Sequence, residues 1–232
     1  MKIEVLPDAA AVAARAAAII AELAREAFQS RGRFLIAVSG GHTPWLMLRE
    51  LAKEQVPWEG VHVFQVDERI APAGDPDRNL THLRQTLLEN APIEPSHIYA
   101  MPVENPDLQA AAAEYAHTIE QLAGSPPVID LVHLGLGPDG HTASLVPNDP
   151  VLQAMDRDVA ITGVYMGRQR MTLTYPVINR ARHILWVVTG GEKVKPLAQL
   201  QSGDKSIPGG KISRNQALII ADRAAAGPGA GE

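Results

Sequence analysis

Short apolar segments alternate with helix-length segments over most of the chain, and this alternation constrains the fold more than any other feature. The apolar segments are rich in β-branched residues, which is typical of buried strands. We expect strands at 33–38, 61–66, 128–134, 159–165, 171–173, 183–189 and 216–221. We expect helices at 8–29, 44–53, 78–90, 107–123 and 192–201.

Strands separated by helices predict an α/β fold with a mostly parallel, twisted sheet and helices on both faces. The segments at 159–165 and 171–173 are expected to pair antiparallel. Asp8 is a candidate N-cap for the first helix, and Thr43 for the second, with Pro44 at its first helical position. The 232 residues contain no repeat or linker, so we expect one domain over 1–232 with a flexible tail from about Ala224.

Composition excludes several classes of function. The hydrophobic content of 46% supports a sizeable core. The net charge of −5 gives no general attraction for nucleic acid or an anionic membrane, so an anionic ligand must be held by local groups. The absence of cysteine excludes disulfides and thiol catalysis. No apolar run reaches membrane-helix length and no signal segment is evident, so we expect a cytoplasmic protein without membrane or nucleic-acid partners.

Four of the predicted strands end in loops with chemically useful residues. In a parallel sheet, such loops lie at the same carboxyl edge and line one pocket. The expected pocket therefore combines the loops at 39–44, 67–69, 135–141 and 189–193.

The loop at 39–44 reads SGGHTP and leads directly into a helix. Gly40 and Gly41 allow a ligand close to the backbone, and the free N–H groups of a helix start favour phosphate. The alternative is an ordinary strand-to-helix turn. Neither the Walker spacing nor GxGxxG is present, so binding of a nucleoside triphosphate or a nicotinamide cofactor is not predicted, and we expect no cofactor.

The loop at 135–141 is more specific, because Asp139 and His141 are separated by a single glycine in a glycine-rich loop. A carboxylate beside an imidazole is suited to proton transfer near neutral pH. His133 alternates within a strand and is expected to be a packed or an edge residue, and His42 is expected to point outward. The other histidines lie in ordinary helix or strand patterns: His62, His82, His97, His117 and His183.

Arg170 and Lys193 are the best-placed cations for an anionic ligand, one before a strand and the other after a Gly-Gly turn. Arg69 follows two carboxylates and fits either a local ion pair or the site. Arg168 and Lys195 are expected to be solvated. No metal site is expected, because HExxH is missing and the carboxylates lack ligand spacing. A serine hydrolase is disfavoured, because no GxSxG elbow occurs.

Taken together, SGGHTP, DER, LGLGPDGHTASLVP, QRMTLTYPVIN and TGGEK resemble the 6-phosphogluconolactonase family in content and order. The resemblance implies a Rossmann-like α/β fold and metal-independent hydrolysis of 6-phospho-D-glucono-1,5-lactone to 6-phospho-D-gluconate in the oxidative pentose phosphate pathway. The partner would be a phosphorylated sugar lactone, and the protein a monomer or small homo-oligomer. The chain departs from the family pattern at Val146, usually Phe, at 70–79, which lacks a common histidine, and at 207–211.

Two alternatives share the expected fold. Glucosamine-6-phosphate deaminases resemble this loop but carry a glutamate five residues after the histidine, where this chain has Val146. Valine cannot assist in opening a sugar ring, which weighs against a deaminase. A non-catalytic sugar-phosphate sensor is the other alternative. Such regulators usually carry a helix-turn-helix segment, whereas here the strand at 33–38 follows a single helix.

The resemblance suggests roles for the candidate residues. His141 would act as the general base on water, with Asp139 or Asp67 orienting its imidazole. Arg69 or backbone N–H groups would stabilise the oxyanion. The substrate phosphate would contact Ser39, Gly40, Gly41, Thr43, Arg170 and Lys193.

Overall fold

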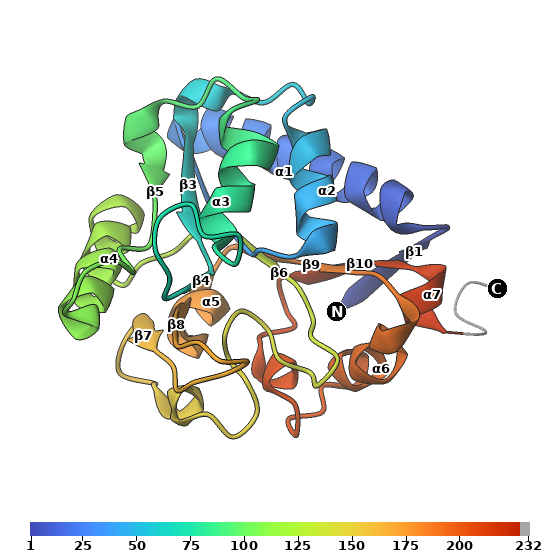
Figure 1. Ribbon diagram of the computed structural model, residues 1–232. Helices are drawn as coiled ribbons and strands as arrows, with labels where there is room; N and C mark the ends of the chain where they lie inside the picture. The colour runs from blue at the N-terminus through green and yellow to red at the C-terminus, as the bar shows by residue number, and fades with distance from the viewer. Residues whose placement is uncertain (228–232) are drawn as a thin grey trace.

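Seven parallel strands form the central sheet in the computed structural model, which describes residues 1–227 (Figure 1). Their order across the sheet is β1-β10-β9-β6-β2-β3-β5. The prediction of a mostly parallel sheet is confirmed, although the two edge strands, β1 and β5, were not predicted. The strands are β1 (Lys2–Leu6), β2 (Phe34–Val38), β3 (Val61–Gln65), β5 (Ile98–Tyr99), β6 (Leu131–Leu134), β9 (His183–Val188) and β10 (Ala217–Asp222).

Helices cover both faces of this sheet, as predicted (Figure 1). Asp8 caps the first helix, because its carboxylate accepts a 2.9 Å hydrogen bond from the Ala11 N–H. A π-helical turn, Arg84–Leu88, continues the third helix. The helices are α1 (Ala9–Arg31), α2 (His42–Leu51), α3 (Asn79–Leu83), α4 (Leu108–Ala123), α5 (Tyr175–Arg180), α6 (Val194–Ser202) and α7 (Arg223–Ala226).

Strand β2 shows why the sheet must be covered twice. All of its residues are buried, and successive side chains point to opposite faces. Phe34, Ile36 and Val38 belong to the core under α1 and α2, whereas Leu35 and Ala37 belong to the core under α4, α5 and α6. The continuous apolar sequence of β2, in which polar and apolar residues do not alternate, therefore reflects burial on both faces of a parallel sheet.

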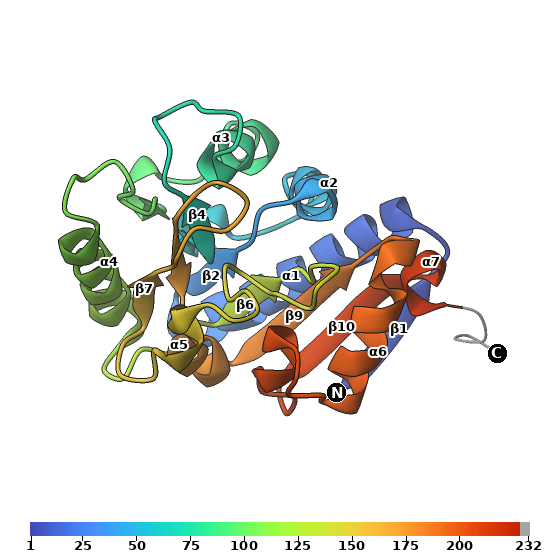
Figure 2. The same cartoon turned by 60° about the horizontal axis from the view of Figure 1, so that its bottom comes forward.

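A small antiparallel sheet extends the fold beyond the carboxyl edge of the central sheet (Figure 2). Its order is β4 (Asp67–Arg69), β8 (Arg170–Leu173) and β7 (Val159–Ile161). Val66 connects the two sheets, since its N–H donates to the Val38 carbonyl and its carbonyl accepts from the Leu173 N–H. The antiparallel pairing is confirmed, but residues 67–69, expected as a loop, form a strand because β8 pairs with them.

The order of the strands reverses between β2 and β6, which are neighbours in the sheet. From β2 the chain continues to β3 on one side, and from β6 it continues to β9 on the other. A crevice forms outside the carboxyl ends of strands at such a reversal. The two glycine loops, 39–41 and 135–141, follow these two strands.

Two local expectations were wrong. Thr43 does not cap α2: the helix begins at His42, Gly41 occupies the N-cap position without a side-chain hydrogen bond, and Thr43 bonds elsewhere. Regular structure does not end at Ala224 either, because Asp222 caps α7 by accepting from the Ala225 N–H. Ala225 is fully buried. The rest of the expected tail, 228–232, lies outside the described residues.

Candidate active site

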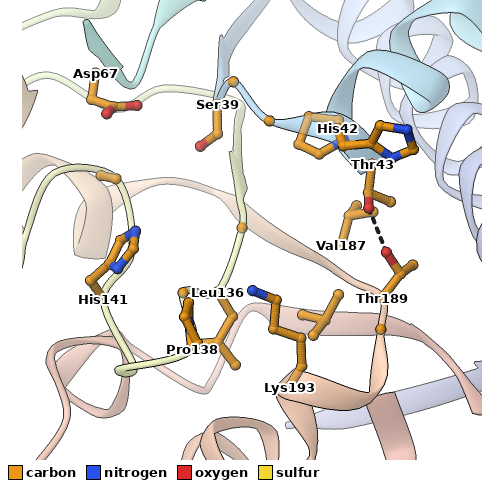
Figure 3. Close-up of a pocket in the computed structure, with 18 of the residues that line it drawn as sticks. Ser39, His42, Thr43, Asp67, Leu136, Pro138, His141, Val187, Thr189 and Lys193 are labelled. Atoms are coloured by element: carbon orange, nitrogen blue, oxygen red, sulfur yellow. Dashed lines mark hydrogen bonds between the residues drawn. The ribbon is translucent and has the colours of Figure 1, made fainter. Parts of the chain in front are cut away.

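The four loops meet in one pocket of about 470 Å³ at the carboxyl edge of the central sheet (Figure 3). The predicted convergence of these loops is therefore confirmed. Nine of the candidate residues line the pocket: Ser39, Gly40, Gly41, Thr43, Asp67, Arg69, His141, Arg170 and Lys193.

Asp139 lies beside the pocket and holds the His141 ring. Its Oδ1 is 2.5 Å from His141 Nδ1 and also accepts a 3.1 Å hydrogen bond from the His141 backbone N–H. Burial raises the pKa of Asp139, but the charge of His141 and the hydrogen bonds from His141 and Tyr165 together hold it below its usual range. An ionised Asp139 fixes Nδ1 as the donor, which leaves Nε2 as the basic nitrogen of the neutral ring.

Two glycines make this loop possible. A Cβ on Gly137 would overlap the His141 ring, so only glycine lets the imidazole lie across this backbone. Gly140 has a φ of +80° and packs against Ile207, and its carbonyl accepts a 2.9 Å hydrogen bond from the Gly209 N–H. The segment at 207–211, where the chain departs from the family pattern, therefore supports the loop that carries Asp139 and His141.

Among the described residues, Asp67 forms no hydrogen bond or ion pair with His141. Its carboxylate accepts a 2.6 Å hydrogen bond from Ser144 Oγ, and Asn79 Nδ2 donates to both its backbone carbonyl and its side chain. Asp139, and not Asp67, is therefore the carboxylate that contacts the His141 ring. Asp67 instead connects β4 to the loop that follows His141. The side chain of Asp67 still faces the pocket (Figure 3).

Three cationic side chains face the pocket. Arg69 and Arg170 are cross-strand neighbours in β4 and β8. Arg69 Nη1 donates to Asn79 Oδ1 at 2.7 Å and to the Asp77 carbonyl, so it is not a simple ion pair with the adjacent carboxylates. Burial lowers the pKa of Arg170 from its usual value, yet a guanidinium remains charged at neutral pH. The Lys193 ammonium points into the pocket (Figure 3).

The double-glycine turn forms the opposite wall from His141. Gly41 precedes the first turn of α2, whose N-terminal end faces the pocket. Thr43 Oγ1 shares a short hydrogen bond with Thr189 Oγ1, which joins this turn to the loop after β9 (Figure 3). Ser39 is anchored below, since its N–H donates to His133 Nδ1 and its hydroxyl donates to the His133 carbonyl.

Two histidine predictions can be judged from burial. His133 is fully buried, as expected, and burial lowers its pKa to about 3. It is therefore neutral at physiological pH and supports Ser39 without titrating. His42 is exposed, although it contributes to the rim of the pocket.

Sequence reasoning missed Asn79 and Tyr165. Asn79 holds both Arg69 and Asp67, and it packs so closely on Gly40 that a Cβ there would overlap its amide. Its only signal was a polar residue at a predicted helix start. Tyr165 donates a 3.1 Å hydrogen bond to Asp139 Oδ2. No local signal identified it, because the contact joins two separate loops.

Among residues 1–227, no group of three or more histidine, aspartate or glutamate side chains has the arrangement of a metal site. The same part of the chain contains no helix with both the length and the apolar character needed to cross a membrane.

A family model and individual relatives both match this chain over most of its length. A family model described as glucosamine-6-phosphate isomerases/6-phosphogluconolactonase matches residues 7–220. A 6-phosphogluconolactonase from Nostoc sp. is 36% identical over 232 residues, covering 97% of this chain and 96% of the relative.

Solved structures agree with this relationship. The 6-phosphogluconolactonase from Trypanosoma cruzi superimposes with a TM-score of 0.86 at 27% identity, covering 97% of this chain and 95% of its own. A monomeric glucosamine-6-phosphate deaminase has a TM-score of 0.85 at 18% identity, with 97% and 99% of the two chains covered. The latter similarity extends to the fold alone, so the fold does not separate the two reactions.

Proposed function

Because the chain belongs to the glucosamine-6-phosphate isomerase/6-phosphogluconolactonase family, we propose that it hydrolyses 6-phospho-D-glucono-1,5-lactone to 6-phospho-D-gluconate, a step of the oxidative pentose phosphate pathway. One observation carries this proposal: His141, held by Asp139, lines a pocket that also presents three cationic side chains. An imidazole base suits attack of water on an ester, and the cations suit a phosphorylated substrate.

In this mechanism, neutral His141 takes a proton through Nε2 from a water molecule as the water oxygen attacks the lactone carbonyl. Asp139 holds the ring and stabilises the imidazolium that forms. Collapse of the tetrahedral intermediate breaks the bond from the carbonyl carbon to the ring oxygen. The imidazolium returns its proton to that oxygen, so the lactone opens to a hydroxy acid.

The substrate phosphate binds against the double-glycine turn and the start of α2, where backbone N–H groups favour an anion. Arg170 and Lys193 supply positive charge to the same pocket. Arg69, held by Asn79, stabilises the oxyanion of the intermediate. The phosphate thus fixes the lactone carbonyl in front of the imidazole, which lowers the entropic cost of the reaction.

The residue five positions after His141 distinguishes this proposal from ring opening by a deaminase. That residue is Val146, which is only 3% exposed and does not line the pocket. An apolar, buried side chain cannot exchange a proton with a sugar. The environment of Val146 therefore supports lactone hydrolysis over deamination.

The test is to generate the lactone from glucose 6-phosphate with a dehydrogenase and to follow its loss with and without the protein. Spontaneous hydrolysis sets the baseline. We expect the wild type to accelerate hydrolysis, and His141→Ala to remain folded while losing about 10²–10⁴-fold in kcat. Release of ammonia from glucosamine 6-phosphate, without acceleration of lactone hydrolysis, would contradict the proposal.

A further inference from the structure

Tyr165 contacts the catalytic pair from a loop outside the recognised motifs. The residue lies between β7 and β8, and its hydroxyl donates to Asp139 Oδ2 at 3.1 Å. The other oxygen of the same carboxylate holds His141 Nδ1. Asp139 is therefore fixed at both oxygens, one bonded to the imidazole and the other to the phenol.

The ring of Tyr165 makes two further contacts in the site. Its centroid lies 5.5 Å from that of His141 in an edge-on arrangement. The guanidinium carbon of Arg170 lies 5.1 Å from the ring centroid, within the range of a cation–π contact. Arg170 Nε is buried and has no hydrogen-bond partner within the described residues. The aromatic ring thus helps to hold a guanidinium that is not fully hydrogen-bonded.

The loop that carries Tyr165, between β7 and β8, is held in place by contacts of Arg168. Tyr165 and Arg168 exchange backbone hydrogen bonds, and the Arg168 guanidinium pairs with Asp75 and Asp77 in the segment after β4. Figure 2 shows this loop, in orange, beside β4. Arg168, expected to be solvated, instead fixes the loop. The neighbouring Val164 is 71% exposed, so it marks the outer side of the loop.

We propose that Tyr165 is a positioning residue for the reaction: its hydroxyl orients Asp139 and thereby His141, and its ring orients Arg170. This inference rests on the proposed function. Burial and the charge of Asp139 raise the pKa of Tyr165 above its usual value, so the phenol stays protonated and remains a donor. The hydroxyl and the ring serve different groups, and two substitutions separate their effects.

Tyr165→Phe keeps the ring and removes the hydroxyl, whereas Tyr165→Leu removes both. We expect Tyr165→Phe to lower kcat by about 3- to 10-fold with KM within about 2-fold of wild type, because the base is less well held. Tyr165→Leu should show the same loss in kcat and also raise KM by about 3- to 10-fold, because Arg170 loses its support. Val164→Ala, in the same loop, is the matched control and should leave both constants unchanged.

A second measurement does not depend on turnover. Without the Tyr165 hydroxyl, the Asp139 carboxylate loses a donor, so its pKa should rise. The ¹³C chemical shift of the Asp139 carboxyl, followed against pH in the substrate-free protein, should show a higher midpoint in Tyr165→Phe and no change in Val164→Ala.

These measurements separate the possible failures. A wild type without lactonase activity would overturn the proposed function, while the carboxyl titration would still report on the hydroxyl contact. An active wild type with wild-type kcat and an unshifted titration in Tyr165→Phe would overturn the role of the hydroxyl. Equal KM values for Tyr165→Phe and Tyr165→Leu would overturn the role of the ring.

Discussion

Gly137→Ala should disable the site through a single added methyl group. Gly137 does not have a positive φ, so its backbone accepts alanine. The new Cβ would nevertheless lie closer than 3.0 Å to Nδ1, Cγ and Cε1 of His141. Ordinary van der Waals contact begins at 3.4 Å, so the imidazole must move. The His141 side chain is 21% exposed, which leaves it room to rotate toward solvent.

The required shift of the ring is about 1 Å, and a misplacement of that size costs about 10²-fold in rate. We therefore expect kcat to fall about 10²-fold. KM should change little, because the residues proposed to bind the phosphate lie on other loops. Gly135→Ala is the matched control: it lies in the same loop, has no positive φ, and its Cβ would meet nothing within 4 Å. Gly135 lines the pocket, so its added methyl group affects KM, whereas kcat should stay nearly wild-type because the imidazole is not displaced.

Steady-state hydrolysis of the lactone, corrected for the spontaneous reaction, measures both variants. Thermal unfolding shows whether they fold, and we expect both to do so. Replacing glycine by alanine lowers the conformational entropy of the unfolded chain. Where space is available, this stabilises the folded state by about 0.4–1 kcal/mol. A Gly137→Ala enzyme with wild-type kcat would refute the steric reasoning. An equal loss of kcat in Gly137→Ala and Gly135→Ala would indicate that reduced loop flexibility, and not displacement of the His141 ring, causes the loss.

Three further outcomes follow from the same contacts. Lys193→Ala and Arg170→Ala should mainly raise KM for the lactone, and an unchanged KM in both would place the phosphate elsewhere. Asp139→Asn should lower kcat by about 10²–10⁴-fold with an unchanged melting temperature, because the imidazole loses its charged acceptor. A kcat within about 2-fold of wild type would contradict this role. Glu68→Gln should lower the free energy of unfolding by about 3 kcal/mol, since it leaves the buried Arg78 without its buried carboxylate. Urea denaturation measures that loss, and a change below about 1 kcal/mol would refute it.

The sequence alone determined the architecture, because the spacing of apolar residues along each segment indicates whether it is a buried strand or an amphipathic helix. Strand β2 and helix α1 with its Asp8 cap were both predicted, since an apolar run and a capping side chain are local features. The capping rule failed at α2, where Thr43 instead bonds to Thr189 in the loop after β9. The Thr43 hydroxyl bonds to a residue that is distant in the sequence and not to the start of its own helix. A local sequence pattern cannot predict such a partner.

The sequence also identified most of the residues that line the pocket, because parallel strands bring their carboxyl ends to one edge. It left open whether Asp67 or Asp139 holds His141. In the tertiary structure, the glycine loop turns Asp139 onto the ring, and Asp67 instead binds Ser144 of another segment.

Only the tertiary structure decided which side chains touch across loops. Tyr165 reaches Asp139, and Asn79 reaches both Arg69 and Asp67, through contacts that no spacing in the sequence announces. Hydrophobic periodicity reports which face of a segment is buried. It does not report where two loops are placed relative to each other, because that placement follows from packing of the whole core around the sheet.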